Sequence, residues 1–133
     1  MNEQVLSDFC RDSGIELLVI FGSSATGREQ QGSDIDIAVK MKRGKVVSKL
    51  DLIYHLGGLF KEREIDLVIL SVDTDPVLLY EIFSYGKPLY EGRPDLFAEE
   101  RLRAFKLYFD TEKLRRLQAE YLKQFTESSR NVS

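Results

Sequence analysis

Residues 15–40 decide the fold and read IELLVIFGSSATGREQQGSDIDIAVK, from Ile15 to Lys40. The run Ile15–Phe21 is apolar except for one glutamate, which predicts a buried strand. Residues 33–40 alternate polar and apolar side chains, which predicts a second strand. The small and polar residues 22–32 between these runs predict a loop. We therefore expect two neighbouring strands joined by a Gly- and Ser-containing loop at the centre of a sheet.

Helices and further strands are expected on both sides of this pair. Apolar residues at helical spacing, stop signals such as glycine, and an aspartate followed by proline mark where these elements begin and end. Together they indicate an α/β domain with a small mixed β-sheet flanked by helices. The other expected elements are a helix ending at Gly14, a crossover helix over 46–60, a strand over 64–70, a helix from Asp75–Pro76 to Tyr85 and an edge strand over 87–91.

The segment after residue 93 has a different character and predicts a C-terminal helical extension. Its apolar residues recur in steps of three and four, which indicates one long helix or two helices broken near Asp110–Thr111. Its aromatic side chains either pack on the domain as core or bind a partner, and the pattern leaves both interpretations open. We divide the chain into residues 1–92, the helical extension 93–126 in the same compact unit, and a frayed tail 127–133. The aromatic residues are Phe105, Tyr108, Phe109, Tyr121 and Phe125.

Size and charge narrow the possible functions. A chain of 133 residues can bury the core of one domain, but we expect no room to enclose a large second substrate. The net charge of −3 provides no overall basic field, so direct binding of nucleic acid is not expected.

The single cysteine, Cys10, excludes an internal disulfide and is expected in the core. Without a signal-peptide pattern or a run near the ~20 apolar residues of a membrane span, we expect a cytoplasmic protein that does not bind membranes.

Three aspartates carry the chemistry that the sequence predicts. Asp34 and Asp36 are two residues apart in an expected strand, so both carboxylates point to the same face. Paired carboxylates repel each other unless a cation lies between them, and such oxygen ligands suit Mg²⁺. Asp66 lies in the next strand, and it joins this group if the two strands are neighbours. Three clustered carboxylates can hold two Mg²⁺ ions, with Asp66 as a second-metal ligand or general base. The turn at Gly22-Ser23 lets backbone amides and a hydroxyl approach phosphate oxygens.

Gly22-Ser23, a ten-residue spacer, Asp34-Ile35-Asp36 and then Asp66 resemble the signature of the DNA polymerase beta superfamily of nucleotidyltransferases. More narrowly, the chain resembles the minimal nucleotidyltransferase (MNT) family, the antitoxin half of prokaryotic pairs whose toxin is a helical HEPN ribonuclease. The match covers residues 15–70. It implies a nucleotidyltransferase fold in which Gly22 and Ser23 hold the ATP phosphates. It also implies that Asp34, Asp36 and Asp66 are catalytic and bind the metal.

The resemblance also implies an activity. In this family AMP passes from ATP to a tyrosine hydroxyl of the cognate HEPN toxin, which is thereby inactivated, so the expected partners are that toxin, ATP and Mg²⁺. One departure concerns the loop after Ser23, where family members often have Ala-Arg-Gly. This chain has Ala25-Thr26-Gly27, and Arg28 follows the glycine.

Two alternatives to a protein adenylyltransferase remain open at this point. The chain could be a catalytically weak antitoxin that silences its toxin by masking it, which the altered loop favours. It could also transfer a nucleotide to a small molecule, although that activity usually needs an additional substrate-holding domain. The intact Asp34, Asp36 and Asp66 favour the enzyme.

Two further features near the expected site have simpler interpretations. The basic residues between 40 and 49 are expected to be solvated, although one or two could contact ATP phosphates or the partner. His55, the only histidine, lies on the expected crossover helix and is expected to be a surface or packing residue rather than a base or a metal ligand. The basic residues are Lys40, Lys42, Arg43, Lys45 and Lys49.

Overall fold

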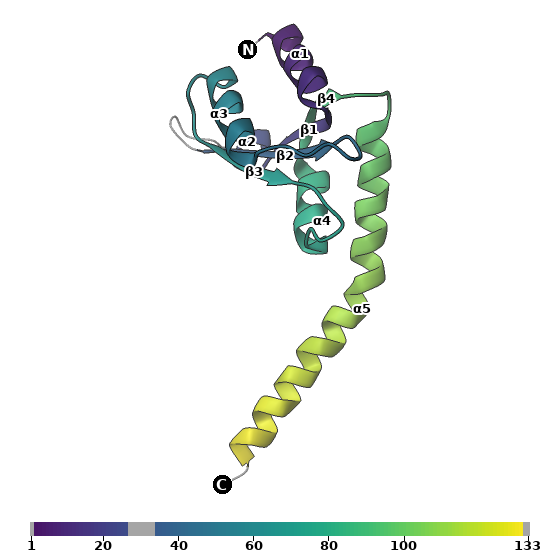
Figure 1. Ribbon diagram of the computed structural model, residues 1–133. Coiled ribbons are helices and arrows are strands. Elements are labelled where there is room, and N and C mark those ends of the chain that lie inside the picture. Colours follow the sequence, from purple (N-terminus) through teal and green to yellow (C-terminus); the bar gives the residue numbers. More distant parts are fainter. Residues whose placement is uncertain (1, 27–33, 132–133) are drawn as a thin grey trace.

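A computed structural model describes residues 2–26 and 34–131 of the chain. Residues 27–33, which include Gly27 and Arg28 of the expected loop, lie outside the described residues. The expected order of helices and strands is confirmed, with one short additional helix directly after the first strand (Figure 1). In chain order the elements are α1 (Glu3–Ser13), β1 (Ile15–Phe21), α2 (Ser23–Thr26), β2 (Ile35–Met41), α3 (Lys49–Leu59), β3 (Ile65–Ile69), α4 (Pro76–Tyr85), β4 (Lys87–Glu91) and α5 (Leu96–Asn131).

The four strands form one mixed sheet in the order β3-β2-β1-β4. β1 pairs antiparallel with both β2 and β4, whereas β2 and β3 are parallel. A parallel pair needs a crossover connection, and α3 provides it. The register places Phe21 beside Asp36 and Asp36 beside Asp66. The expected α/β class and mixed sheet are therefore confirmed.

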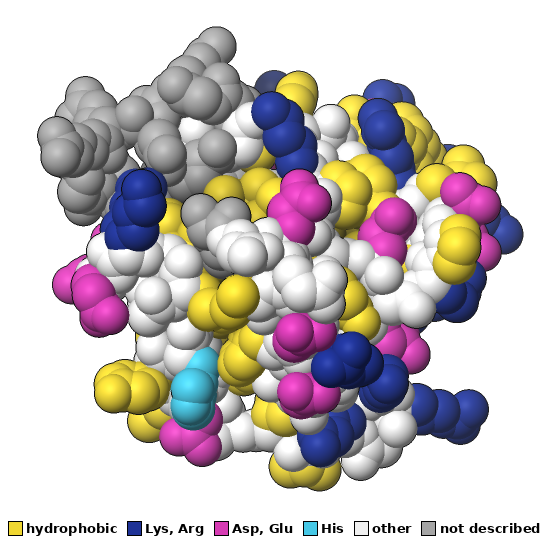
Figure 2. Space-filling model, turned by 90° about the horizontal axis from the view of Figure 1, so that it is seen from above, with side chains coloured by type: hydrophobic (Ala, Val, Ile, Leu, Met, Phe, Trp, Pro, Cys, Tyr) yellow, Lys and Arg dark blue, Asp and Glu magenta, His cyan; other side chains and the backbone are white. Residues whose placement is uncertain are grey.

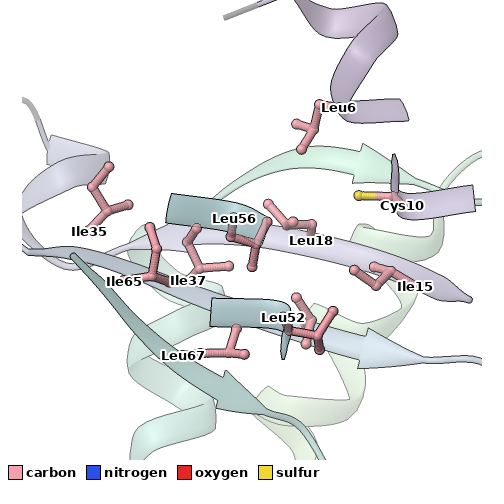
Figure 3. Close-up of a cluster of buried hydrophobic side chains, with 11 residues drawn as sticks. Leu6, Cys10, Ile15, Leu18, Ile35, Ile37, Leu52, Leu56, Ile65 and Leu67 are labelled. Carbon is pink, nitrogen blue, oxygen red and sulfur yellow. The ribbon is translucent and has the colours of Figure 1, made fainter. Parts of the chain in front are cut away.

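The first face of the sheet is covered by α1 and α3 (Figure 3). Its core is apolar: among its members Leu18, Ile37 and Leu56 are completely buried. A fully buried side chain of this size contributes roughly 1.5–3 kcal/mol relative to an exposed one. Cys10 belongs to the same cluster, and burial raises the pKa of its thiol to about 12. It is therefore an inert core residue, as the sequence predicted.

The second face is covered by α4 and the first part of α5. Leu17 and Val19 of β1, together with Ala38 of β2, pack here against Ile82 and Phe83 of α4. The alternation of strand side chains puts Asp36 and Asp66 on this second face, since their neighbours Ile35, Ile37 and Ile65 belong to the first. β2 thus presents only apolar side chains to the first face, whereas its second face combines Asp36 with the core residue Ala38.

Short local signals fix where most elements start and stop. Gly14 ends α1 in the left-handed conformation, with φ of 79°. The carboxylate of Asp75 accepts a hydrogen bond from the backbone N–H of Val77 at 2.8 Å, and Pro76 occupies the first turn of α4. These boundaries agree with the sequence prediction because each depends only on adjacent residues.

The crossover helix differs from the prediction in its start and its buried face. α3 begins at Lys49 after Ser48, whose hydroxyl accepts from the N–H of Asp51, rather than at residue 46. Leu50 and Tyr54, two of the apolar residues whose helical spacing predicts this helix, are 77% and 79% exposed. Leu52 and Leu56 are buried instead. The apolar residues of this segment cover more than half of the helix circumference, so spacing alone did not select the correct face.

The C-terminal extension is one continuous helix. α5 runs from Leu96 to Asn131, so no break occurs near Asp110–Thr111, and the helix continues past residue 126, where we expected fraying to begin. Figure 1 shows α5 changing direction about halfway along. The Thr111 hydroxyl donates to the carbonyl of Leu107 at 2.9 Å, a bond that commonly bends helices without ending them. Arg115 also donates to the carbonyl of Tyr108 at 3.0 Å and lies over that ring.

The two halves of α5 have different surroundings. The first half packs on α4, where Phe105 and Tyr108 contact the ring of Tyr80. The second half projects away from the sheet (Figure 1). No helix in the described part of the chain combines the length and the apolarity needed to cross a membrane.

Candidate active site

Gly22 connects the end of β1 to α2 and lies directly against a carboxylate. Its φ of 68° is in the left-handed region, which L side chains rarely adopt. A Cβ at this position would overlap the Oδ2 of Asp36. Both observations require glycine here, because the backbone must turn sharply while passing next to that carboxylate. The predicted Gly-Ser turn is thus brought into contact with the predicted Asp-x-Asp motif.

Asp36 and Asp66 are direct neighbours across the parallel strands β2 and β3. Adjacent strands lie about 4.8 Å apart, so these two side chains on one face must meet. The pKa of Asp36 is raised above its ordinary value, first by burial and then by the charge of Asp66 and a hydrogen bond with it. The charge of Asp34 raises it further. The three predicted aspartates therefore form one electrostatically coupled group.

Asp66 differs from the sequence expectation in its exposure. The apolar residues around it suggested that burial makes this carboxylate costly, but its side chain is exposed and Asp36 is the half-buried member of the pair. The reason is topological: β3 is an edge strand, and α4 and α5 leave the beginning of β3 open. The exposed position gives a ligand direct access to Asp66.

Glu81 is a fourth acidic residue of the site that the sequence analysis missed. It lies on α4, and its charge contributes to the raised pKa of Asp36. The sequence contains one hint of this role: Glu81 is the only charged residue in the otherwise uncharged helix PVLLYEIFSY. This hint could not be used without knowing that α4 covers the same face of the sheet as Asp36.

The donor set fits Mg²⁺, although it does not form a complete cage. Within residues 2–26 and 34–131 there is no group of three or more His, Cys, Asp or Glu side chains positioned to hold a metal ion. Mg²⁺, however, is usually bound by one or two carboxylates together with water and substrate phosphate oxygens. The mutual repulsion that raises the Asp36 pKa is the kind that a dication relieves. Asp36 and Asp66, with Asp34 beside them, therefore suit a metal that arrives with a phosphate ligand.

Lys40 and His55 have contacts away from the aspartates. Lys40 forms ion pairs with Glu100 at 2.9 Å and Glu16 at 3.6 Å. The Nδ1 of His55 lies 2.7 Å from the carbonyl oxygen of Asp51, and its ring stacks on Phe9. The packing role predicted for this histidine is confirmed. On the side of the molecule that Figure 2 shows, basic and acidic side chains are interspersed rather than gathered by sign.

A family model described as Polymerase beta, Nucleotidyltransferase matches residues 3–95, about 70% of the chain. The chain belongs to this family. The matched region contains the turn at Gly22 and all three aspartates, as well as Glu81. Comparison with curated protein sequences gave no significant match.

Solved structures with the same fold extend the likeness beyond the matched region. One is a chain of a toxin–antitoxin crystal structure with AMP-PNP, with a TM-score of 0.73 and 23% identity, covering 92% of this chain and 99% of that chain. Another belongs to a structure of tri-AMPylated Shewanella oneidensis HEPN toxin in complex with MNT antitoxin, with a TM-score of 0.66 and 21% identity over 91% and 95% of the two chains. The expected nucleotidyltransferase fold with a long C-terminal helix is confirmed.

Proposed function

We propose that this chain is an antitoxin of the MNT type that transfers AMP from ATP to a tyrosine hydroxyl of a cognate HEPN ribonuclease toxin and thereby inactivates it. The observation that carries this proposal is the register of Asp36 beside Asp66, with the backbone of Gly22 against the Asp36 carboxylate. This arrangement joins a phosphate-approaching turn to paired carboxylates. Nothing in this arrangement depends on the residues outside the described part of the chain.

The catalytic roles follow from the positions of these residues. Gly22 and Ser23 contact the triphosphate, because the turn leaves backbone groups and a hydroxyl accessible there. Asp34, Asp36 and Asp66 would hold Mg²⁺, which would neutralise phosphate charge and favour ionisation of the attacking hydroxyl. The acceptor oxygen forms a bond to the α-phosphorus, the bond from that phosphorus to the β-bridging oxygen breaks, and pyrophosphate leaves. Asp66, the exposed member of the pair, accepts the proton of the acceptor hydroxyl.

A protein acceptor is supported by the structural relatives. The chain matches 99% and 95% of the lengths of the two relatives described above. One of those structures contains AMP-PNP, and the toxin in the other is tri-AMPylated. A relative that carries the same elements and no more supports the inference that the acceptor hydroxyl arrives on a second protein.

A masking antitoxin is the second candidate, and one observation favours it. The apolar side chains in the second half of α5 are exposed and could bind a toxin without any chemistry, while the carboxylates form no complete metal cage within the described residues. The two candidates differ in one measurable property. Adenylylation leaves AMP on the toxin, whereas masking leaves the toxin chemically unchanged.

The decisive experiment follows the label of ATP carrying ³²P in its α-phosphate. The chain is incubated with Mg²⁺ and the HEPN-type protein encoded beside it, and label on that protein is quantified. Asp36→Asn is expected to reduce transfer by about 10³-fold, since the charge stabilisation of several kcal/mol that a metal supplies is lost. Asp73→Asn, an exposed aspartate in the turn before α4, is the matched control and is expected to transfer normally.

Two results would contradict the proposal. The first is the absence of label from the wild-type reaction while the ribonuclease is still silenced, which would support masking. The second is equal transfer by Asp36→Asn and Asp73→Asn, which would place the chemistry elsewhere.

A further inference from the structure

An apolar stripe runs along the projecting half of α5. We call it the α5 stripe, and its members are between 53% and 68% exposed. Helical geometry puts them within an arc of about 140°. In proteins, most of the stability of a helix comes from packing of its amphipathic face rather than from intrinsic helix propensity. The α5 stripe consists of Leu114, Leu117, Tyr121, Leu122 and Phe125.

A cavity lies at the base of α5, on the same side of the helix as the stripe. This cavity has a volume of about 430 Å³ and lies between β2, α4 and the first half of α5. Leu107 lines it, and because Leu114 follows seven residues later, the two side chains lie only about 20° apart around the helix. Val72, which is 99% exposed, lies at its mouth. Cavity and stripe therefore lie on the same side of α5, with the polar residues Asp110 and Thr111 between them.

The cavity leads toward the candidate active site. Lys40 lines the cavity, and it lies on β2 four residues after Asp36. Two residues of equal parity in a strand face the same side, and four steps of about 3.3 Å separate them by about 13 Å. A protein bound along α5 with a side chain in the cavity would thus lie on the face of the sheet that carries the aspartates.

The charged side chains along the stripe favour an acidic occupant. At its edges lie two basic residues, Lys113 and Arg115, and one acidic residue, Glu120. Arg116 and Glu112 lie on the opposite side of the helix and pair with each other at 2.7 Å. A helix with acidic residues beside its apolar face would be attracted by the excess of basic charge at these edges.

We propose that the cavity and the α5 stripe form the docking surface for an amphipathic helix of the acceptor protein, with acidic residues beside its apolar face. The inference rests on the proposed function only for the identity of the acceptor. Docking here holds the acceptor next to the aspartates for the time that transfer requires. It also covers apolar surface that is otherwise exposed to water.

The test measures binding separately from chemistry. The Asp34→Ala/Asp36→Ala double variant is titrated without ATP against the HEPN-type protein encoded beside the chain, and further substitutions are made in that background. Leu117→Glu and Tyr121→Glu are each expected to raise the Kd about tenfold or more, because binding would bury an unpaired carboxylate. Val72→Glu at the mouth of the cavity is expected to raise it several-fold.

A matched control lies on the same helix. Leu102 is 72% exposed, and its side chain lies about 120° around α5 from Leu114. Leu102→Glu introduces the same charge and is expected to change the Kd less than twofold. Circular dichroism of each variant checks that the helix content is retained.

Several results would overturn the docking surface. These are absence of binding by the parent double variant, a Kd unchanged by Leu117→Glu and Tyr121→Glu, and a Kd raised equally by Leu102→Glu. Sedimentation that finds the chain alone dimeric, and monomeric after Leu117→Glu, would assign the stripe to a second copy. Failure of the proposed function is a separate result: no label transfer by the wild-type chain, while the stripe variants still weaken binding.

Discussion

The two faces of the sheet use the same strands for different purposes. On the first face, under α1 and α3, the inward side chains are apolar along the whole length of β2. On the second face, β2 has Asp36 at one end, Ala38 in the middle and Lys40 at the other end. The first face supplies stability, whereas the second gives up apolar contacts at both ends of the strand to place charged groups. Substitutions on the two faces should therefore differ in size and even in sign.

The largest loss of stability is expected from the first face. Leu18→Ala removes a completely buried side chain and should lower the free energy of unfolding by about 2–5 kcal/mol, through lost burial and the cavity left behind. Urea titration at fixed pH measures this change. Leu50→Ala on α3, where the side chain is 77% exposed, is the control and should change it by less than about 0.5 kcal/mol. Equal effects of the two would mean that the first face is not the main core.

A smaller loss of stability is expected at Gly22, where the backbone turn contacts the Asp36 carboxylate. Gly22→Ala should cost about 1–3 kcal/mol, because alanine is strained at this positive φ and its Cβ would overlap Asp36 Oδ2. The double variant Gly22→Ala/Asp36→Gly separates the two causes, since it removes the overlap and keeps the backbone strain. If Gly22→Ala lowers the free energy of unfolding by the same amount in the Asp36→Gly background as in the wild type, the overlap contributes nothing.

Lys40, at the end of β2 far from the aspartates, should contribute less to stability. Lys40→Met removes the ion pairs to Glu100 and Glu16 and leaves Glu100, whose side chain is 12% exposed, without this cation. We expect a loss of about 1 kcal/mol, reduced in high salt. Lys49→Met at the start of α3 is an exposed control that should show no loss. A loss above that of Leu18→Ala would overturn the ranking of the two faces.

The smallest change in stability is expected from Asp36→Asn, and it should be a gain rather than a loss. Because burial and the neighbouring Asp66 raise the pKa of Asp36, the folded state binds this proton more tightly than the unfolded chain does. Without a metal, stability should therefore fall as the pH rises from the ordinary aspartate pKa near 3.8 through the raised folded value. Asp36→Asn should remove this decline and be at least as stable as the wild type at neutral pH. A decline of equal size in Asp36→Asn would assign it to another group.

Local patterns predicted much of the fold because they report on local physics. The strand Ile15–Phe21 and the helix start at Asp75–Pro76 lie where the sequence placed them, since each depends on adjacent residues. The exposure of Leu50 and Tyr54 was not predictable in the same way. It depends on which side of α3 meets the sheet, and the apolar residues of this segment allow more than one choice.

The site shows the same division between local and long-range information. The Gly22-Ser23 turn and the aspartate pair were visible as a motif, and the prediction that Asp66 joins them required only that β2 and β3 be neighbours, which is confirmed. The exposure of Asp66 depends on β3 being an edge strand, and Glu81 reaches the site only because α4 covers the second face. The assignment of Asp34, Asp36 and Asp66 as metal ligands stays a prediction.

The parallel pairing of β2 with β3 also determines when the site can exist during synthesis. Asp36 and Asp66 are thirty residues apart, and they can become neighbours only after the intervening α3 has crossed the sheet. A nascent chain that has emerged only as far as β2 therefore carries a turn and two carboxylates but lacks the third. The pair of neighbouring carboxylates therefore forms in a single step, when β3 adds to the sheet beside β2.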